Sequence, residues 1–260
     1  MSAWRVGMLV LVLATACAQS PAARSATPRT ATGDTAGTAI AGDVTVFAAA
    51  SLTDAFERIG QVFEARHPDA TVRFNFAGSQ RLAAQIVEGA PADVFASADA
   101  RQMEAVEPAI APVTFAGNVL QIVVEPGNPR DVTELGDLGD RDITVVLAAD
   151  EVPAGRYARQ ALDAAGVTVA PVSLETDVRA VLSKVALGEA DAGIVYASDV
   201  AAAGDAVTGI AIARDHNPAA AYPAAVLEGA PNPAGGQAFL DLLTSPEGQR
   251  VLRDAGFSTP

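Results

Sequence analysis

The chain has 260 residues, of which half are hydrophobic and 18% are charged, a composition typical of a globular protein with a substantial core. Its net charge is −14, and Lys184 is its only lysine. This balance excludes a nucleic-acid-binding protein, which needs clustered Lys and Arg to meet phosphates, and it excludes docking on anionic lipid through a basic patch.

Residues 1–16 have the pattern of an export signal. Arg5 gives a short positive start, and an apolar run that ends at Ala14 follows it. The run is too short to span a bilayer, so it predicts a cleaved signal peptide. Cys17 comes next, and the five residues ending there resemble a bacterial lipobox, in which the cysteine is lipidated. We therefore expect an exported protein, in the periplasm or on the outer face of the cell membrane, anchored by lipid at Cys17. Signal cleavage without lipidation is the alternative.

The segment after the signal peptide predicts a tether. Residues 17–42 consist mainly of Ala, Thr, Ser, Pro and Gly, with almost no large apolar side chain. Such a segment buries too little apolar surface to offset the loss of chain entropy, so we expect it to be disordered. Folded structure is expected from Val44 onward.

From Val44, short β patterns alternate with helical patterns. Helices are predicted at 52–63, 82–87, around 103, 155–165, 177–187, 234–243 and 246–255. Strands are predicted at 44–47, 71–76, 94–96, 119–124, 143–147, 193–196 and 210–213. This alternation predicts an α/β protein with parallel-dominated sheets and helices on both faces.

In four places a turn of small residues leads directly into a helical pattern. Ser51 and Asp54 form a capping-box pattern in the first of these turns. Each helix start exposes unpaired N–H groups and the positive end of the helix dipole. In open α/β sheets such starts gather at the carboxyl edge of the strands, where together they form an anion site. Any one of them alone is also explained as an ordinary helix cap. The four segments are 48–54, 76–82, 152–157 and 175–179.

Several segments resemble signature motifs of the periplasmic molybdate-binding proteins of ABC importers, a type II periplasmic binding protein family. The matching segments occur in the family's order and cover about residues 43–258. The resemblance implies two lobes joined by a hinge of crossing strands, with lobe 1 formed by 43–119 plus 222–260 and lobe 2 by 120–221. The crossings are expected near 118–120 and near 222–223. The matching motifs are 46–52, 89–99, 152–155, 193–196, 222–223 and 256–257.

The resemblance also implies a binding site. In that family, the metal is bound as its oxyanion, molybdate. The donors are two serine hydroxyls, backbone N–H groups and a tyrosine hydroxyl. Carried over by matching motif, the binding residues are Ser51, Ser79 and Tyr196 through their hydroxyls, and Ala154 and Val178 through their backbone amides. The resemblance implies no cofactor, no catalytic residue and no membrane contact beyond the lipid anchor. We expect a monomer that captures molybdate, and tungstate, in the interlobe cleft and delivers it to a membrane permease.

The chemistry of these donors favours a fully ionised tetrahedral dianion. Every oxygen of such an ion accepts hydrogen bonds, whereas phosphate at neutral pH carries a proton that needs an acceptor. Charge-assisted hydrogen bonds supply affinity without a buried side-chain charge. Sulfate is a dianion of the same kind, so a receptor for sulfate or another oxyanion with this fold is the alternative.

Two other classes fit the sequence less well. A Ser-His-acid hydrolase needs an oriented histidine, and only His67 and His216 are present, both in surface-type segments. The nucleophile-elbow, phosphate-loop and dinucleotide motifs are absent, and the histidines are not paired for a metal. A purely adhesive lipoprotein would leave the four helix-start turns unexplained.

Overall fold

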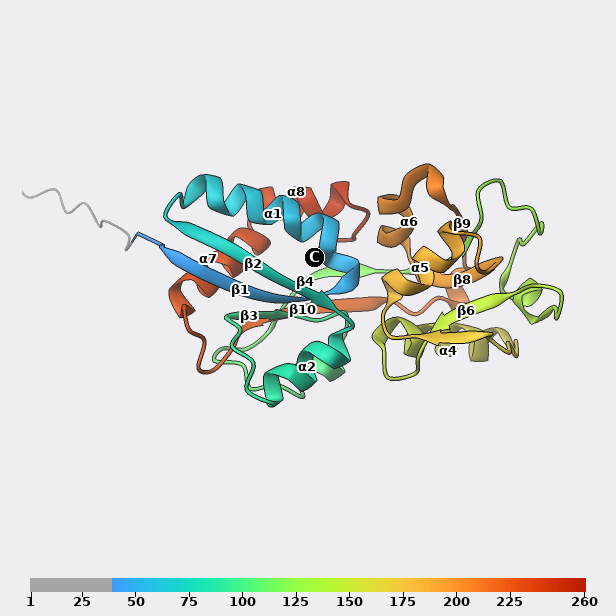
Figure 1. Cartoon of the computed structure of the whole chain (residues 1–260), viewed down its shortest axis with the longest axis horizontal. Helices are drawn as coiled ribbons and strands as arrows, with labels where there is room; N and C mark the ends of the chain where they lie inside the picture. Colours follow the sequence, from blue (N-terminus) through green and yellow to red (C-terminus); the bar gives the residue numbers. More distant parts are fainter. Residues whose placement is uncertain (1–38) are drawn as a thin grey trace, which may run out of the picture. The chain divides into compact units, whose positions relative to one another are not determined.

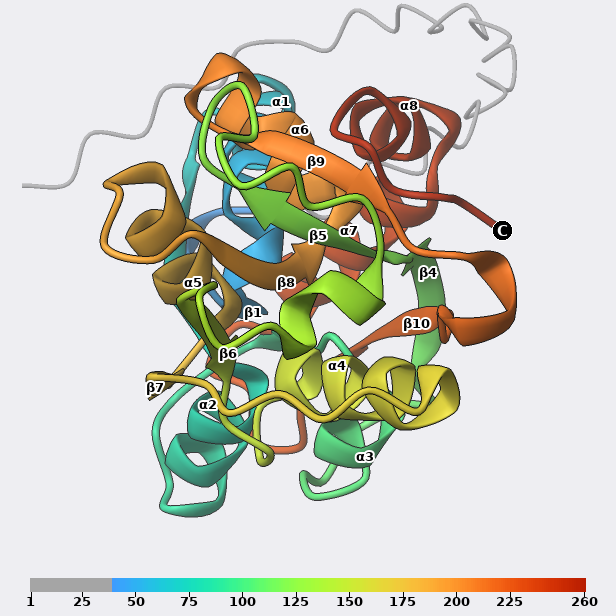
Figure 2. The same ribbon diagram turned by 90° about the vertical axis from the view of Figure 1, so that its right-hand side faces the viewer.

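The computed structural model describes residues 39–260 (Figures 1 and 2). Two lobes can be distinguished in it, each built around a five-stranded sheet. The predicted signal peptide, Cys17 and most of the predicted tether lie outside the described residues. Within them, no helix is both long and apolar enough to cross a membrane.

The sheet of lobe 1 has the strand order β2-β1-β3-β10-β4. Strand β1 is parallel to β2 and β3, while β10 is antiparallel to β3 and β4. The strands are β1 (Gly42–Ala49), β2 (Ala70–Ala77), β3 (Val94–Ala96), β4 (Val113–Asn118) and β10 (Ala220–Val226).

Helices cover both faces of this first sheet (Figure 1). Val44 and Val46 of β1 point to the core under α1 (Thr53–Arg66), α7 (Pro233–Thr244) and α8 (Pro246–Asp254). Phe47 points to the opposite face and packs under α2 (Ser79–Val87) and α3 (Ala100–Met103). This alternation is the two-residue period of a strand that is buried on both faces.

The sheet of lobe 2 has the order β7-β6-β8-β5-β9. Strand β6 is parallel to β7 and β8, while β5 is antiparallel to β8 and β9. Helices α5 and α6 pack on one face and α4 on the other (Figure 1). The elements are β5 (Leu120–Val124), β6 (Val145–Ala148), α4 (Pro153–Ala165), β7 (Ser173–Glu175), α5 (Val178–Ala186), β8 (Ala192–Tyr196), α6 (Ala197–Ala203) and β9 (Thr208–Ala211).

The chain crosses between the two sheets twice. It leaves the first sheet at Asn118 and enters the second at Leu120, and it returns in the segment between Ala211 and Ala220. Tyr222 and Pro223 lie inside β10, where the register shifts between them. Such an irregularity accommodates a proline, which has no N–H to donate to the neighbouring strand.

The predicted two-lobed α/β fold is confirmed, but each sheet is mixed rather than mainly parallel. Two of the four strand pairs in each sheet are antiparallel, because β5 and β10 run against their neighbours after each crossing. β4, β7, β10 and α6 were not predicted from the sequence. β7 has three residues and an exposed leucine at a sheet edge, and β10 is rich in alanine and contains a proline, so neither has a strong strand pattern.

Candidate functional site

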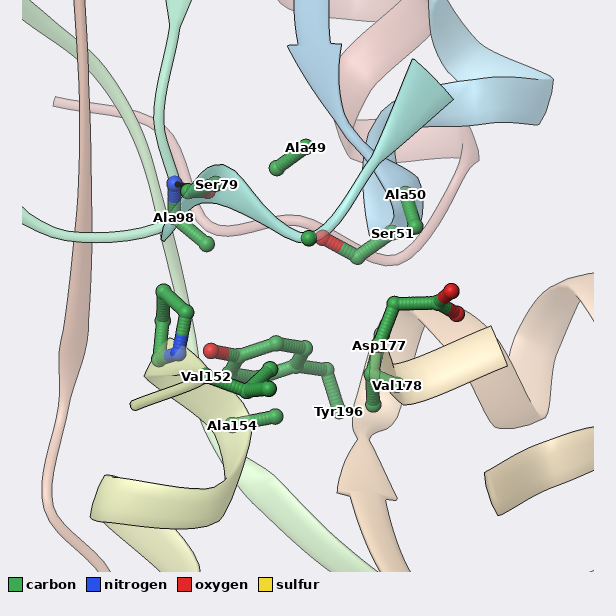
Figure 3. A pocket seen from close by; sticks show the side chains of 12 residues that line it. Ala49, Ala50, Ser51, Ser79, Ala98, Val152, Ala154, Asp177, Val178 and Tyr196 are labelled. Atoms are coloured by element: carbon green, nitrogen blue, oxygen red, sulfur yellow. Dashed lines mark hydrogen bonds between the residues drawn. The ribbon is translucent and has the colours of Figure 1, made fainter. Parts of the chain in front are cut away.

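A small pocket lies between the two lobes, with an empty volume of about 210 Å³. This volume is all the space between the atoms and includes some open solvent; the centre of a water-sized sphere can reach only about 10 Å³ of it, far less than the roughly 300–1,000 Å³ of sites for drug-sized molecules. The size therefore fits a small ion. The lining residues are Ala49, Ala50, Ser51, Gly78, Ser79 and Ala98 from lobe 1, and Val152, Pro153, Ala154, Asp177, Val178 and Tyr196 from lobe 2 (Figure 3).

Lobe 1 contributes two serine hydroxyls. Ser51 lies in the 3₁₀ turn η1 (Ala50–Leu52) after β1, and its Oγ is 2.9 Å from the hydroxyl of Tyr222. Ser79 is the first residue of α2, and its Oγ accepts a hydrogen bond of 3.1 Å from the amide of Ala98. Both serines are at most 2% exposed. Each hydroxyl oxygen thus has a hydrogen-bond partner within the protein.

The predicted capping box at Ser51 and Asp54 is wrong. Neither side chain caps α1, because the 3₁₀ turn precedes the helix and Leu52 occupies the cap position. Ser51 is bonded to Tyr222, and the carboxylate of Asp54 accepts a hydrogen bond from Arg179 in the other lobe. The spacing suits a capping box only where the helix begins directly after the serine.

Lobe 2 contributes two helix starts. Pro153 is the first residue of α4 and has no N–H, so the amide of Ala154 is the first one that this helix presents. Val178 is the first residue of α5, and Asp177 caps this helix by accepting a hydrogen bond from the amide of Ala180. Amides in the first turn of a helix have no partner within it and lie at the positive end of its dipole. Both are suited to an anion.

Tyr196 ends β8 and contributes the third hydroxyl of the pocket. Its side chain is buried, and its hydroxyl has no hydrogen-bond partner among the described residues. Burial raises the pKa of Tyr196 well above its ordinary value, and the nearby Tyr222, Tyr157 and Asp199 act in the same direction. The hydroxyl therefore keeps its proton. A buried donor without a partner costs free energy unless a ligand meets it.

The structure thus brings all five sequence-predicted residues to one pocket (Figure 3). Among the described residues that line it there is no lysine or arginine, and Asp177 is the only charged one. That carboxylate is occupied as the cap of α5, and Asp150 is exposed and bonded to Arg159. The pocket therefore offers hydrogen-bond donors in an apolar surrounding, where electrostatic interactions are stronger than in water.

Charged side chains surround the pocket without lining it. Arg179, next to Val178, donates to Asp199 within lobe 2 at 2.7 Å and to Asp54 in lobe 1. Burial raises the pKa of Asp199 to about 6, although the Arg179 guanidinium and the amide of Tyr196 oppose this shift. Arg156 of lobe 2 forms an ion pair with Asp99 of lobe 1.

A neutral contact also joins the lobes. The side-chain amide of Gln80 donates to the carbonyl oxygen of Thr176 at 2.9 Å. Together with the ion pairs of Arg179 and Arg156, it joins the two lobes across the cleft. These residues were not among those predicted, although Gln80, Arg156 and Arg179 stand within the four helix-start segments.

The histidines do not approach the pocket. His67 ends α1 in lobe 1, where its ring packs against Phe63, and His216 lies in the 3₁₀ turn η4 (Arg214–His216) between the sheets. Within residues 39–260, no group of three or more His, Cys, Asp or Glu side chains could hold a metal ion directly.

Two lobes that enclose a pocket of fixed donors define a solute-binding protein. Residues 44–258 match the family model described as bacterial extracellular solute-binding protein. The chain is 40% identical over 257 residues to the molybdate-binding protein ModA of Mycobacterium tuberculosis, covering 97% of this chain and 95% of that protein. It is 36% identical over 240 residues to ModA of Escherichia coli, with coverage of 86% and 92%.

The chain therefore belongs to the ModA family of molybdate-binding proteins, within the bacterial extracellular solute-binding proteins. This membership confirms the prediction of a binding protein rather than an enzyme.

Solved structures agree on the fold. The periplasmic molybdate-binding protein of Azotobacter vinelandii superposes with a TM-score of 0.74 at 21% identity, covering 84% of this chain and 99% of that one. The sulfate-binding protein SubI of M. tuberculosis superposes with a TM-score of 0.75 at 17% identity, covering 84% and 87%. Since receptors for two different oxyanions share the fold, the fold alone does not identify the ligand.

Proposed function

We propose that this protein captures molybdate, and also tungstate, in the interlobe pocket and delivers it to the permease of an ABC importer. The observation that carries the proposal is the donor set of the pocket. Hydroxyls of Ser51, Ser79 and Tyr196 and first-turn amides of Ala154 and Val178 line one small space, and the one carboxylate among its described lining residues, that of Asp177, caps α5. The family relationship to molybdate-binding proteins supports the same ligand.

The donor set explains how a protein of net charge −14 binds a dianion. Each hydrogen bond to a charged ligand contributes roughly 1.5–3 kcal/mol, so five can supply tight binding after the cost of association. The donors are fixed before the ligand arrives, because the serines and tyrosine are buried and the amides belong to helix starts. A neutral site also avoids the desolvation penalty of a buried arginine or lysine.

Ligand entry and release require the cleft to open. The contacts of Gln80, Arg156 and Arg179 across the cleft support a closed form in this structure. We infer that the two crossing segments act as the hinge, with the lobes divided near residue 119 and just before β10, slightly ahead of the expected division at 222. We also infer that the protein works as a monomer. Hinge closure about a ligand is a common mode of domain motion.

Calorimetric titration with molybdate, tungstate, sulfate and phosphate tests the proposal. We expect molybdate and tungstate to bind with similar affinity, because a rigid cage distinguishes ions of nearly equal size poorly. Smaller sulfate should leave donors unmatched, at about 1–3 kcal/mol each, and two such losses weaken binding by at least 30-fold. If sulfate displaces molybdate at comparable concentration, the protein is a sulfate receptor instead.

For the mature protein, we propose an exported form anchored by lipid at Cys17. The support is the lipobox-like sequence before this only cysteine, and the extracellular family to which the chain belongs. Metabolic labelling with a fatty-acid probe should mark the wild type and leave Cys17→Ser unmarked. An unlabelled mature wild type would favour plain signal cleavage.

A further inference from the structure

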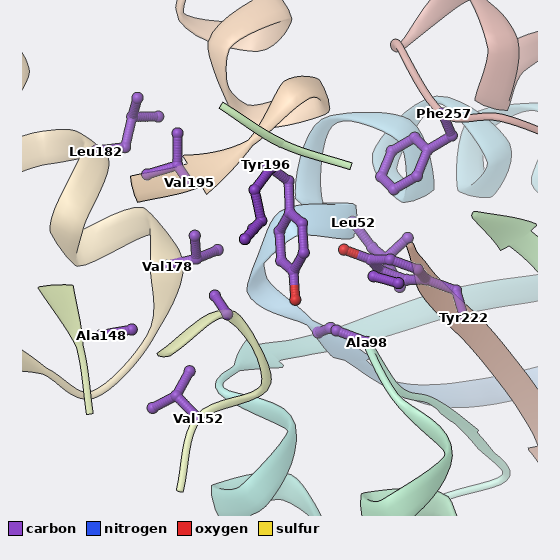
Figure 4. Packing of buried hydrophobic residues seen from close by; sticks show 14 of the residues in the cluster. Leu52, Ala98, Ala148, Val152, Val178, Leu182, Val195, Tyr196, Tyr222 and Phe257 are labelled. Atoms are coloured by element: carbon purple, nitrogen blue, oxygen red, sulfur yellow. The ribbon is translucent and has the colours of Figure 1, made fainter. Parts of the chain in front are cut away.

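Tyr222 stands behind the pocket rather than in it. It belongs to β10, is fully buried, and is not among the residues that line the pocket. Its ring packs edge-on against Tyr196 and Phe257, with centroids 5.8 and 5.4 Å away (Figure 4). Its hydroxyl lies 2.9 Å from the Oγ of Ser51, which does line the pocket. The surrounding rings hold that hydroxyl in place.

The direction of this hydrogen bond follows from counting protons. A serine hydroxyl has one proton to donate and lone pairs to accept with. A fully ionised oxyanion has only acceptors, so Ser51 must use its proton on the ligand. It then has none for Tyr222, and the bond between them forms only if Tyr222 donates. Burial raises the pKa of Tyr222 above its ordinary value, so this proton is retained.

Ser79 shows the same arrangement with a different donor. Its Oγ accepts a hydrogen bond from the amide of Ala98, which leaves its own proton for the pocket. A backbone amide cannot reverse direction, so Ser79 is oriented permanently. At Ser51 the corresponding donor is a tyrosine side chain, and a single substitution can remove it.

We propose that Tyr222 is a positioning residue for oxyanion binding, which donates its proton to Ser51 and thereby turns the Ser51 hydroxyl toward the ligand. The relay Tyr222–Ser51–ligand also polarises the Ser51 hydroxyl, because hydrogen bonds in a chain strengthen one another. This inference rests on the proposed function and adds a residue to the site. A protonated anion should also bind more weakly, because the Ser51 hydroxyl is oriented as a donor and does not accept the anion's proton.

A double-mutant cycle tests the proposal. Molybdate affinity is measured by calorimetry for the wild type, Tyr222→Phe, Ser51→Ala and the double variant. Tyr222→Phe keeps the ring and its packing, so we expect it to fold, and its melting temperature without ligand checks this. Losing one hydrogen bond should weaken binding about 2- to 12-fold in the wild-type background. In the Ser51→Ala background the same change should alter affinity less than 2-fold.

The cycle separates orientation from packing. If Tyr222 only packs, its substitution weakens binding equally in both backgrounds, and the proposal is overturned. Unchanged affinity of Tyr222→Phe overturns it too. Tyr157→Phe removes another tyrosine hydroxyl, outside the pocket lining, and should bind like the wild type. If the wild type binds neither molybdate nor tungstate, the proposed function fails; if it binds and the cycle shows no coupling, only the role of Tyr222 fails.

Discussion

The amide of Ala154 cannot be removed by a side-chain substitution, but a substitution at the neighbouring Gly155 can displace it. Gly155 is the third residue of α4 and packs against the end of β6. A methyl group there would come well within 3.0 Å of the carbonyl oxygens of Ala148 and Ala149. These are backbone atoms that cannot swing aside, so Gly155→Ala must push the start of α4 away from the sheet by about 1 Å to reach ordinary contact at 3.4 Å.

The size of the effect follows from two opposing terms. Overpacking typically costs 1–3 kcal/mol, while replacing glycine by alanine within a helix returns up to about 1 kcal/mol. We expect a net loss of about 1–2 kcal/mol, or a melting temperature lower by about 2–8 °C. Binding sites tolerate only about 0.5 Å of displacement. Loss of the charge-assisted bond from Ala154 should therefore weaken molybdate binding by roughly 10- to 150-fold.

Gly248 provides a matched control. It is the third residue of α8, also two residues after a proline, and a methyl group there meets the carbonyl oxygens of Leu242 and Leu243 in the same way. Gly248 does not line the pocket. Thermal melting and calorimetric titration of both variants should show similar destabilisation but lost affinity only in Gly155→Ala. Wild-type affinity of a folded Gly155→Ala would refute the role given to the Ala154 amide.

Three further predictions concern the ligand, the hydroxyl donors and pH. Molybdate at about 1,000 times Kd should add roughly 4 kcal/mol to the free energy of unfolding, and so raise the melting temperature by about 8–16 °C; no shift at millimolar ligand contradicts an oxyanion receptor. Ser51→Ala, Ser79→Ala and Tyr196→Phe should each weaken molybdate binding by about 1.5–3 kcal/mol by titration, and wild-type affinity in both serine variants would show that the assigned donors are wrong. Because burial raises the pKa of Asp199 to about 6, the folded protein holds a proton that the unfolded chain releases near pH 4. This group's contribution to the free energy of unfolding therefore falls as pH rises from about 4 to 6, and Asp199→Asn should lose that slope in pH-dependent melting; an identical slope in the variant would contradict the shifted pKa.

The fold was largely predictable because many of its helices and strands have clear patterns of apolar residues in the sequence. Helices such as α1 and α5 show apolar residues at helical spacing, and β1 is a short apolar run before a turn of small residues. The antiparallel strands were not predictable, since strand direction depends on where the chain crosses between lobes. The residues of a strand do not by themselves show where that crossing lies.

The pocket residues were predicted from helix starts and family motifs, which are local features of the sequence. Tyr222 and Asp199 were not assigned a role, because their partners lie 171 and 20 residues away in the chain. Tyr222 stood within a recognised motif, but only the folded arrangement shows its hydroxyl behind Ser51. Likewise, Asp54 fits a local capping pattern, and its actual partner comes from the other lobe.

The position of β10 between β3 and β4 has a consequence for how the chain folds. All five strands of the second sheet lie consecutively between Leu120 and Ala211, so that sheet can form as soon as this stretch is available. The first sheet cannot be completed until β10 inserts, and β10 begins only at Ala220. Contacts between distant segments form slowly because a long loop must close first. As the chain emerges from its N-terminus, the second sheet can therefore be complete before the first: β2, β1 and β3 can already pair with one another, but β3 lacks its second neighbour and β4 its only one until the last residues arrive.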